Sequence, residues 1–261
     1  MTTLDRSLGA RPFHVPAPGA VLSRVRELVL TWEFAVYFAI VAVAFTFRIW
    51  DVGSRALHHD ESLHAYFSWR YLTEFYYQHD PLMHGPFQFH GAAFFMRIFG
   101  DSDFTVRLLP VVMGTLTVAA PVFFRPYMSR LAVIALMVML AFSPTILYFN
   151  RFLREDTYVG LWTIGLIICV FRYLKTGNFR YLVIGGAFLA LDFATKETTF
   201  MTSASFVVFF NGAAAWDLAE QRTQHAGAGS RFLRFLAYLP VAWAVALAWP
   251  AIRSWRGSRG F

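Results

Sequence analysis

The fold class is decided by the stretch TWEFAVYFAIVAVAFTFRI, residues 31–49, which is apolar for almost its whole length. A helix needs about 20 mostly apolar residues to cross a bilayer. Six further stretches of this kind lie at residues 104–124, 131–149, 157–174, 181–195, 199–216 and 232–250. The sequence therefore predicts an all-α protein, a polytopic transmembrane helical bundle of about seven spans.

The composition agrees with a membrane protein and excludes several other classes. Of the 261 residues, 57% are hydrophobic and 15% are charged, whereas about 25% are charged in a typical soluble domain. Such a chain is neither disordered nor collagen-like, and Cys169 is its single cysteine, so it forms no intramolecular disulfide. The net charge is +7, and the basic residues lie mainly between the apolar runs. This placement indicates that the positive charges set the membrane topology, and we expect no nucleic-acid partner.

The basic residues fall on alternate connections between the predicted spans. Those that would share one side of the membrane are Arg6, Arg11, Arg24, Arg26, Arg125, Arg130, Arg172, Lys175, Arg180, Arg222, Arg231 and Arg234. The positive-inside rule places this side in the cytoplasm. We therefore expect a multi-pass protein of the cell (inner, cytoplasmic) membrane, with a cytoplasmic N-terminal leader at 1–30.

The last predicted span raises a question about the end of the chain. The transmembrane domain would cover residues 31–250, and a basic tail would follow at 251–261. A seventh crossing would place Arg253, Arg256 and Arg259 outside, against the positive-inside rule. We expect either that the last span does not cross or that the chain is truncated.

The first outer loop, residues 50–103, is long and acidic, with seven acids against three arginines. Within it, the stretch DESLHAYFSWRYLTEFYYQ, residues 60–78, has apolar residues at helical spacing and a polar opposite face. Its many aromatic residues are typical of a helix that lies in the membrane interface. A second amphipathic helix is predicted at 86–99, because Pro81 and Pro86 fix its start.

Asp60 and Glu61 stand at the start of the first amphipathic helix. A simple interpretation of Asp60 is that it caps this helix. Both acids have helical spacing to His64, so Asp60, Glu61 and His64 could share a divalent metal cation. The alternative is that the histidines of this loop are interfacial hydrogen-bonding groups.

Two more charged clusters are expected at the outer ends of spans. Asn150-Arg151-Phe152-Leu153-Arg154-Glu155-Asp156 ends the third span and enters the fourth, and Lys196-Glu197 follows the fifth. The latter could equally be a self-satisfied pair. Carboxylates deprotonate hydroxyls or hold cations, and Arg and Lys bind phosphate. If the clusters converge, they suit group transfer from a lipid phosphate at the outer membrane face.

These motifs resemble the GT-C superfamily of polytopic glycosyltransferases, the clan of protein O-mannosyltransferases and aminoarabinose transferases. The order that carries the resemblance is Asp60-Glu61, HDPL (79–82), FGDSDFTVRLLPVVMGTLTV (99–118), SPTILYFNRFLREDTYVG (143–160) and GGAFLALDFATKETTF (185–200). The chain is most similar to the flippase-activity-associated subfamily, and it departs from the pattern at Asp80, where the family often has proline. The family members are longer, and this chain resembles only their N-terminal catalytic half.

The resemblance implies an inverting membrane glycosyltransferase that moves a sugar from a polyprenyl phosphate to a lipid, glycan or protein acceptor among the membrane lipids. It implies Asp60 as the catalytic base with Glu61 beside it, and Asp156 as the second-loop acid. Arg107, Arg151, Arg154 and Lys196 are the candidates for binding the lipid phosphate. The alternatives are a transporter or flippase partner, and a non-catalytic scaffold of a glycan-assembly pathway.

Overall fold

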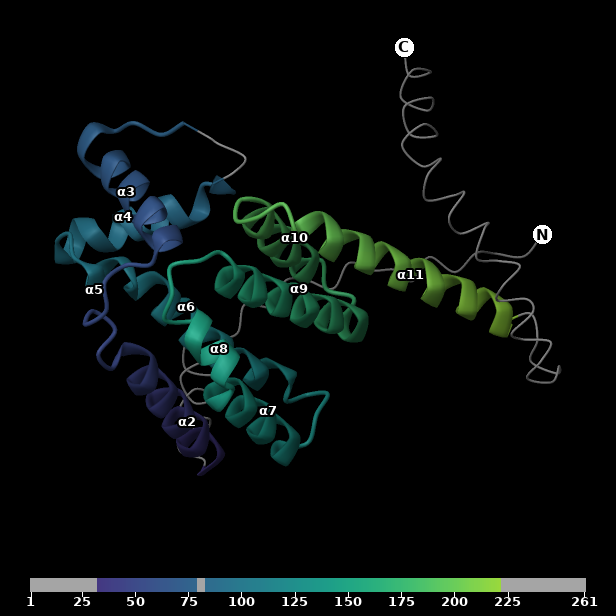
Figure 1. Cartoon of the computed structure of the whole chain (residues 1–261). Helices are drawn as coiled ribbons and strands as arrows, with labels where there is room; N and C mark the ends of the chain where they lie inside the picture. The colour runs from purple at the N-terminus through teal and green to yellow at the C-terminus, as the bar shows by residue number, and fades with distance from the viewer. Residues whose placement is uncertain (1–31, 79–82, 222–261) are drawn as a thin grey trace, which may run out of the picture.

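The computed structural model describes residues 32–78 and 83–221 (Figure 1). In this part of the chain every regular element is a helix, so the prediction of an all-α bundle is confirmed. The leader, the HDPL turn, the expected span 232–250 and the basic tail lie outside the described residues. The number of about seven spans therefore stays a prediction.

Long apolar helices form the body of the described part. The elements are α2 (Trp32–Ile49), α3 (His59–Glu74), α4 (Phe87–Phe99), α5 (Asp103–Val106), α6 (Leu108–Ala119), η2 (Ala120–Phe124), α7 (Arg130–Phe142), α8 (Pro144–Phe149), α9 (Asp156–Thr176), α10 (Arg180–Phe193) and α11 (Thr199–Gln221). Three helical stretches of the described residues, Trp32–Ile49, Asp103–Phe124 and Asp156–Thr176, are long and apolar enough to cross a membrane. Figure 1 shows α2, α6 and α7 packed side by side.

The stretch 131–149, expected as one span, is not one continuous helix, because it breaks at Ser143. Helix α7 ends at Phe142 and α8 begins at Pro144, with Ser143 between them in a non-helical conformation. Proline has no N–H to donate and disfavours the helical conformation in the residue before it. The buried Arg48 donates to the Ala141 carbonyl at 3.5 Å and so satisfies a free carbonyl at this break.

The first outer loop is folded, as the sequence indicated. Helix α4 begins within one residue of the expected start, but α3 ends at Glu74 and not at residue 78. Phe75 follows in the left-handed region, with φ of 52°, which terminates the helix. The two helices pack on each other at one end of the bundle (Figure 1).

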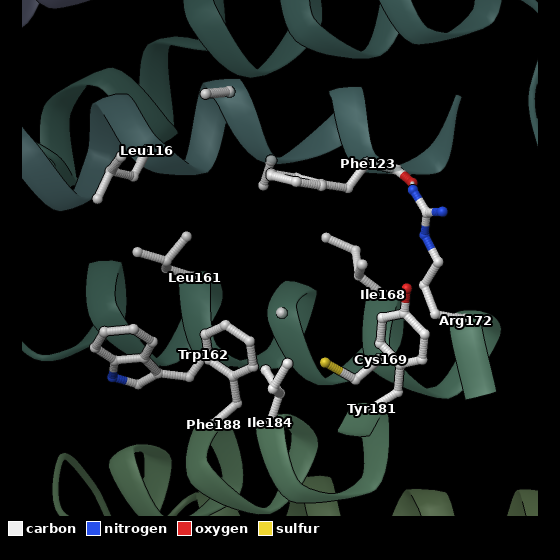
Figure 2. Close-up of a pocket in the computed structure, with 13 residues that line it drawn as sticks. Leu116, Phe123, Leu161, Trp162, Ile168, Cys169, Arg172, Tyr181, Ile184 and Phe188 are labelled. Carbon is white, nitrogen blue, oxygen red and sulfur yellow. Dashed lines mark hydrogen bonds between the residues drawn. The ribbon is translucent and has the colours of Figure 1, made fainter. Parts of the chain in front are cut away.

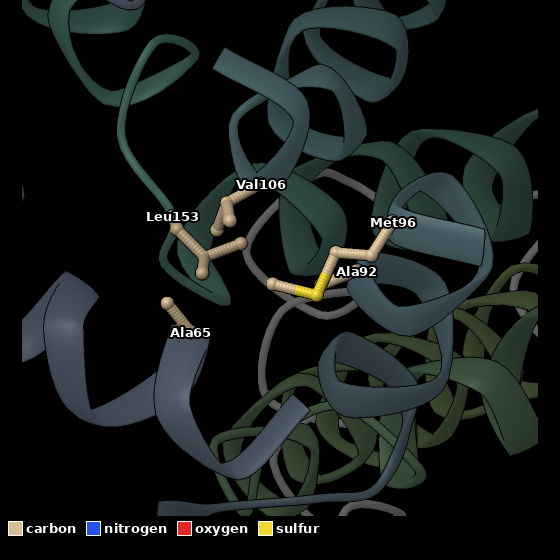
Figure 3. Packing of buried hydrophobic residues seen from close by; sticks show 5 residues of the cluster. All are labelled: Ala65, Ala92, Met96, Val106 and Leu153. Carbon is tan, nitrogen blue, oxygen red and sulfur yellow. The ribbon is translucent and has the colours of Figure 1, made fainter. Parts of the chain in front are cut away.

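A small apolar core holds these loop helices on the bundle. Ala65 of α3, Ala92 and Met96 of α4 and Val106 of α5 surround Leu153, which lies in the connection before α9 (Figure 3). Leu153 is fully buried. Burial of such side chains stabilises the packing by about 25 cal/mol for each Å² removed from water, so α3 and the residues around Leu153 are held in contact.

The basic connections meet at the opposite end of the bundle. Glu33, at the start of α2, accepts from Arg125 at 2.6 Å and pairs with Arg130 at 3.0 Å. Arg172 and Lys175, at the end of α9, donate to carbonyls of residues 123 and 126. The basic connections around 125–130 and 172–175 therefore lie at one end of the bundle, as expected, and we call it the basic end. The leader and the connection with Arg222, Arg231 and Arg234 lie outside the described residues, so their side stays a prediction.

Candidate active site

Glu61 and Arg107 form a buried ion pair at the end of the bundle opposite the basic end. Nε of Arg107 donates to Oε1 of Glu61 at 2.8 Å, and Nη2 donates to Oε2 at 2.7 Å. The Glu61 carboxylate also accepts from the backbone N–H of Leu153 at 3.0 Å and of His58 at 3.1 Å. Burial alone would raise the pKa of Glu61, but these donors outweigh it and hold the pKa below its usual value.

Arg107 also forms hydrogen bonds to the backbone of the loop before α3. Its Nη1 donates to the carbonyls of Val52 and Arg55 at 2.9 and 2.8 Å, and its Nη2 donates to that of Ala56 at 3.2 Å. An arginine has five N–H donors, and these bonds together with the two to Glu61 engage all of them. The predicted role of Arg107 in phosphate binding stays a prediction, and its contacts favour a structural role.

Asp60 does not cap α3, so the simple interpretation of this residue is wrong. The N-cap is His58, whose side chain accepts from the backbone N–H of Asp60, and Glu61 completes a capping box by accepting from the His58 backbone. Asp60 is therefore the second residue of the helix, and 41% of its side chain is exposed. Its carboxylate is available to a ligand.

Arg154 connects Asp60 to Asp156. Its Nη1 lies 3.5 Å from Oδ2 of Asp60, and its Nε lies 3.9 Å from Oδ2 of Asp156. Lys196 donates to Oδ1 of Asp156 at 2.7 Å. Asp60, Arg154, Asp156 and Lys196 thus form one exposed ionic chain, and the structure brings together residues that the sequence placed in three separate clusters.

Lys196 and Glu197 are not a self-satisfied pair. Lys196 bonds to Asp156, whereas Oε2 of Glu197 lies 2.8 Å from Nδ1 of His84. The backbone N–H of Gly85 donates to the Thr195 carbonyl at 3.0 Å, and this places the residues before α4 beside Lys196. The Lys196 side chain is therefore held by Asp156 of α9, whereas the backbone of Thr195 is held by Gly85, just before α4.

A buried polar cluster lies next to the exposed ionic chain. Oε1 of Glu155 is 3.2 Å from Nε2 of His64 and accepts from Nε2 of Gln88 at 2.9 Å. Burial raises the pKa of Glu155. Burial, together with the smaller effects of the nearby charges of His84 and Arg154, lowers the pKa of His64 to about 4. Both groups therefore favour their neutral forms.

Four polar atoms of this buried cluster have no hydrogen-bond partner among the residues that the structure describes. They are Nδ1 of His64, Oε1 of Gln88, Oε2 of Glu155 and the hydroxyl of Tyr158. Buried polar atoms are nearly always paired, so these atoms can bind water or the hydroxyls of a polar ligand. From the sequence, His64 is predicted as a metal ligand and Glu155 belongs to the charged cluster at 150–156. No local pattern marks Gln88, because it meets a residue 67 positions away.

The three predicted metal ligands do not form one site. Both oxygens of Glu61 are engaged by Arg107 and backbone N–H groups, and Nε2 of His64 faces Glu155. Among residues 32–78 and 83–221, no group of three or more His, Cys, Asp or Glu side chains is placed to hold a metal. Asp60, Glu61 and His64 as the structure places them therefore do not fit a shared metal.

Arg151 lies apart from the exposed ionic chain. Its Nη2 donates to the Trp50 carbonyl at 2.6 Å, and it lines a cavity that Asp60, Arg154 and Asp156 do not line. The structure therefore separates Arg151 from Arg154, although only two residues lie between them.

An apolar cavity of about 570 Å³ extends through the bundle along α9 (Figure 2). Figure 2 shows Leu116 and Phe123 on one wall, Leu161 and Ile168 of α9 in the middle, and Phe188 of α10 on the other wall. At one end of the cavity, Nε1 of Trp162 donates to Oγ1 of Thr195 at 3.1 Å, next to Lys196. At the other end is Arg172, which belongs to the basic end.

A protein-family model described as dolichyl-phosphate-mannose-protein mannosyltransferase matches residues 83–252. The match covers well over half of the chain and includes Arg154, Asp156 and Lys196, whereas Asp60 and Glu61 precede it. It does not distinguish subfamilies, so the resemblance to flippase-activity-associated proteins stays a prediction. None of the curated proteins compared with the chain matches it.

Proposed function

This chain belongs to the dolichyl-phosphate-mannose-protein mannosyltransferase family, and we propose that it transfers a sugar from a polyprenyl phosphate to an acceptor hydroxyl at the membrane face that carries the exposed ionic chain. The family makes the protein a membrane glycosyltransferase. The donor, the acceptor and the membrane face belong to the proposal.

The observation that carries the proposal is the position of Arg154 between Asp60 and Asp156. Transfer from a sugar phosphate needs a base for the acceptor hydroxyl and cations for the departing phosphate. Asp60 is an exposed carboxylate, and Arg154 and Lys196 are cations of the same ionic chain. The candidate base, Asp60, therefore lies next to Arg154, a candidate phosphate-binding group.

In the proposed reaction, Asp60 accepts the proton of the acceptor hydroxyl while the hydroxyl oxygen attacks the anomeric carbon. The bond from that carbon to the phosphate oxygen breaks, and its electron pair leaves with the polyprenyl phosphate. Attack from the side opposite the leaving group inverts the configuration at the anomeric carbon. The proton remains on Asp60 until solvent removes it.

Arg154 and Lys196 would stabilise the phosphate as it leaves. Arginine binds phosphate in a bidentate manner and lysine acts as a point charge. In the free protein Arg154 contacts Asp60, so a phosphate would take the place of this carboxylate at Arg154. At Lys196 it would use the N–H donors that are not bonded to Asp156. Asp156 keeps Lys196 oriented at 2.7 Å and orients the acceptor in this proposal.

The apolar cavity along α9 would take part of the polyprenyl chain. Its Trp162 end is joined to Thr195, the residue before Lys196. A lipid phosphate bound at Lys196 would thus have apolar surface directly beside it. Apolar pockets with a few polar groups at one end are typical of sites for amphipathic ligands.

We place the basic end in the cytoplasm and the exposed ionic chain on the outer face of the cell membrane. The positive-inside rule supports this orientation, since Arg125, Arg130, Arg172 and Lys175 all lie at the basic end. Reporter fusions to the two ends would test it, and activity of a cytoplasmic reporter next to Asp60 would contradict it.

The test of the function is sugar transfer in membranes that contain the full chain, with a radiolabelled polyprenyl-phosphate sugar as donor. We expect Asp60→Asn to lower the rate by about 10²–10⁴-fold, as for the loss of a positioned base. The matched control is Glu74→Gln at the exposed end of the same helix, where the acid pairs only with Arg70. This control should leave the rate unchanged.

Equal rates for the wild type and Asp60→Asn would refute Asp60 as the base. If the wild type inserts into the membrane and transfers no sugar from any polyprenyl phosphate, a scaffold or flippase-associated role replaces the proposal. A parallel assay with a chelator decides the metal question, because loss of transfer on chelation would require a divalent cation held by other ligands.

A further inference from the structure

A second polar cavity, of about 470 Å³, lies between the loop that precedes α3 and helix α8. We call it the loop cavity. The buried pair of Glu61 and Arg107 forms part of its wall, whereas Asp60, Arg154, Asp156 and Lys196 do not line it. The loop cavity is therefore distinct from the exposed ionic chain, and neither the family match nor the proposed transfer assigns it a ligand.

Two arginines supply unpaired positive charge to the loop cavity. Arg55 is exposed, and its guanidinium has no hydrogen bond or ion pair within the described residues. Arg151 donates from Nη2 to the Trp50 carbonyl, and its other donors have no partner in the part of the chain that the structure describes. Arginine is well suited to bidentate binding of phosphate.

The negative charge around the cavity does not cancel these arginines. Of the two acids that line it, Glu61 is neutralised by Arg107. Asp51 is the other, a single negative charge among lining residues that include both Arg55 and Arg151. The cavity therefore has a net positive charge, which attracts an anion.

One wall of the loop cavity is aromatic. The ring of Phe152 lies 5.4 Å from that of His58 and 5.9 Å from that of Tyr148, between centroids. Trp50, at the end of α2, is 73% exposed beside Arg151. Exposed Trp and Tyr at a helix end are typical of the headgroup level of a bilayer, so the cavity opens where phosphate groups of lipids lie.

We propose that the loop cavity binds a phosphate group through Arg55 and Arg151, with the aromatic wall against the rest of the ligand. The source of the phosphate is either a phospholipid headgroup or free inorganic phosphate. The proposal does not rest on the transferase activity, because it concerns binding at residues outside the exposed ionic chain.

The test measures binding to the purified full chain in two arms. In one arm, the chain is placed in nanodiscs with phosphatidylglycerol or phosphatidylcholine, and retained lipid is measured by native mass spectrometry. In the other, inorganic phosphate binding is measured by equilibrium dialysis at constant ionic strength. The variants are Arg55→Gln and Arg151→Gln, with Arg97→Gln as the matched control, an exposed arginine of α4 that does not line the cavity.

We expect Arg55→Gln and Arg151→Gln each to weaken binding by about tenfold, and Arg97→Gln to bind as the wild type does. Retention of phosphatidylglycerol without phosphate binding would identify the source as a lipid, and arginine-dependent phosphate binding would show that the free ion suffices. Equal binding by all variants, or no binding of either probe, would overturn the proposal. Because the exposed Arg55 side chain has no hydrogen bond or ion pair within the described residues, we expect Arg55→Gln to change binding and leave the fold intact.

Discussion

Arg107 holds both carboxylate oxygens of Glu61, at 2.8 and 2.7 Å, and both side chains are almost fully buried. The pair joins the start of α3 to the turn between α5 and α6. Since Leu153 also donates to Glu61 at 3.0 Å, the same carboxylate positions the connection that contains Arg154. The exposed ionic chain therefore depends on a buried pair that lies beside it.

We expect Arg107→Met to lower the free energy of unfolding by about 3–5 kcal/mol, because it leaves the buried Glu61 without its partner. Thermal unfolding in detergent measures this effect. The matched control is Arg70→Met, which breaks an exposed pair with Glu74, and exposed pairs contribute little. Equal losses in the two variants would show that the buried pair is not structural.

Lys196→Gln should raise the KM for the polyprenyl-phosphate donor by about tenfold, since a charge-assisted hydrogen bond to the phosphate is lost. Lys196→Arg should restore part of the affinity. Lys175→Gln, which changes a lysine at the basic end, is the control and should leave the KM as it is. If Lys196→Gln lowers kcat alone, the residue does not bind the donor in its ground state.

His64 should make the protein less stable in acid. Its pKa is about 4 in the folded state against 6.5 for the free side chain, so the unfolded state takes up a proton first as the pH falls. The neutral His64 therefore contributes its full stabilisation of the folded state above pH 6.5. This contribution, up to about 3 kcal/mol of unfolding free energy, is lost as the pH falls towards 4. Glu155 acts with the opposite sign, because its raised pKa lowers stability as the pH rises.

Unfolding of wild type and His64→Gln from pH 4 to 7 tests this prediction. The variant should lack the loss in acid, and the exposed His59→Gln should behave like the wild type. A His64→Gln curve parallel to that of the wild type would mean that His64 is not kept neutral by burial.

Gly85→Ala should displace the residues before α4 from Thr195. A β-carbon at Gly85 would collide with the backbone carbonyl of Ala194, and the bond from Gly85 to Thr195 would weaken. We expect a loss of about 1–3 kcal/mol in unfolding free energy and slower sugar transfer, because Lys196 follows Thr195. Gly186→Ala, where a β-carbon meets open space, is the control.

If Gly85→Ala both unfolds and transfers sugar like the wild type, the two segments are not held together as the structure shows. Normal stability with slower transfer would instead indicate a local shift at Lys196. The unfolding measurement therefore reports the effect on packing, and the transfer rate reports the effect on the position of Lys196.

The sequence by itself determined the all-α class, the position of α4 and the common end of the basic connections around 125–130 and 172–175. These features follow from local rules, because apolar runs predict helices that cross a bilayer and prolines limit where a helix can begin. The break at Pro144 obeys the same local rule, although the long apolar stretch 131–149 suggested one span. The resemblance supplied Asp60 and Asp156 as one pair of candidates.

Only the tertiary structure decided which of the neighbouring acids Asp60 and Glu61 is exposed. Glu61 is buried because Arg107 and Leu153 reach it from 46 and 92 positions away, whereas the Asp60 carboxylate pairs with Arg154, which is itself partly exposed. Adjacent residues on a helix face different directions, and the packing of α3 on the bundle selects the direction that is buried. No local pattern contains that information, since it depends on which distant side chains arrive at each face.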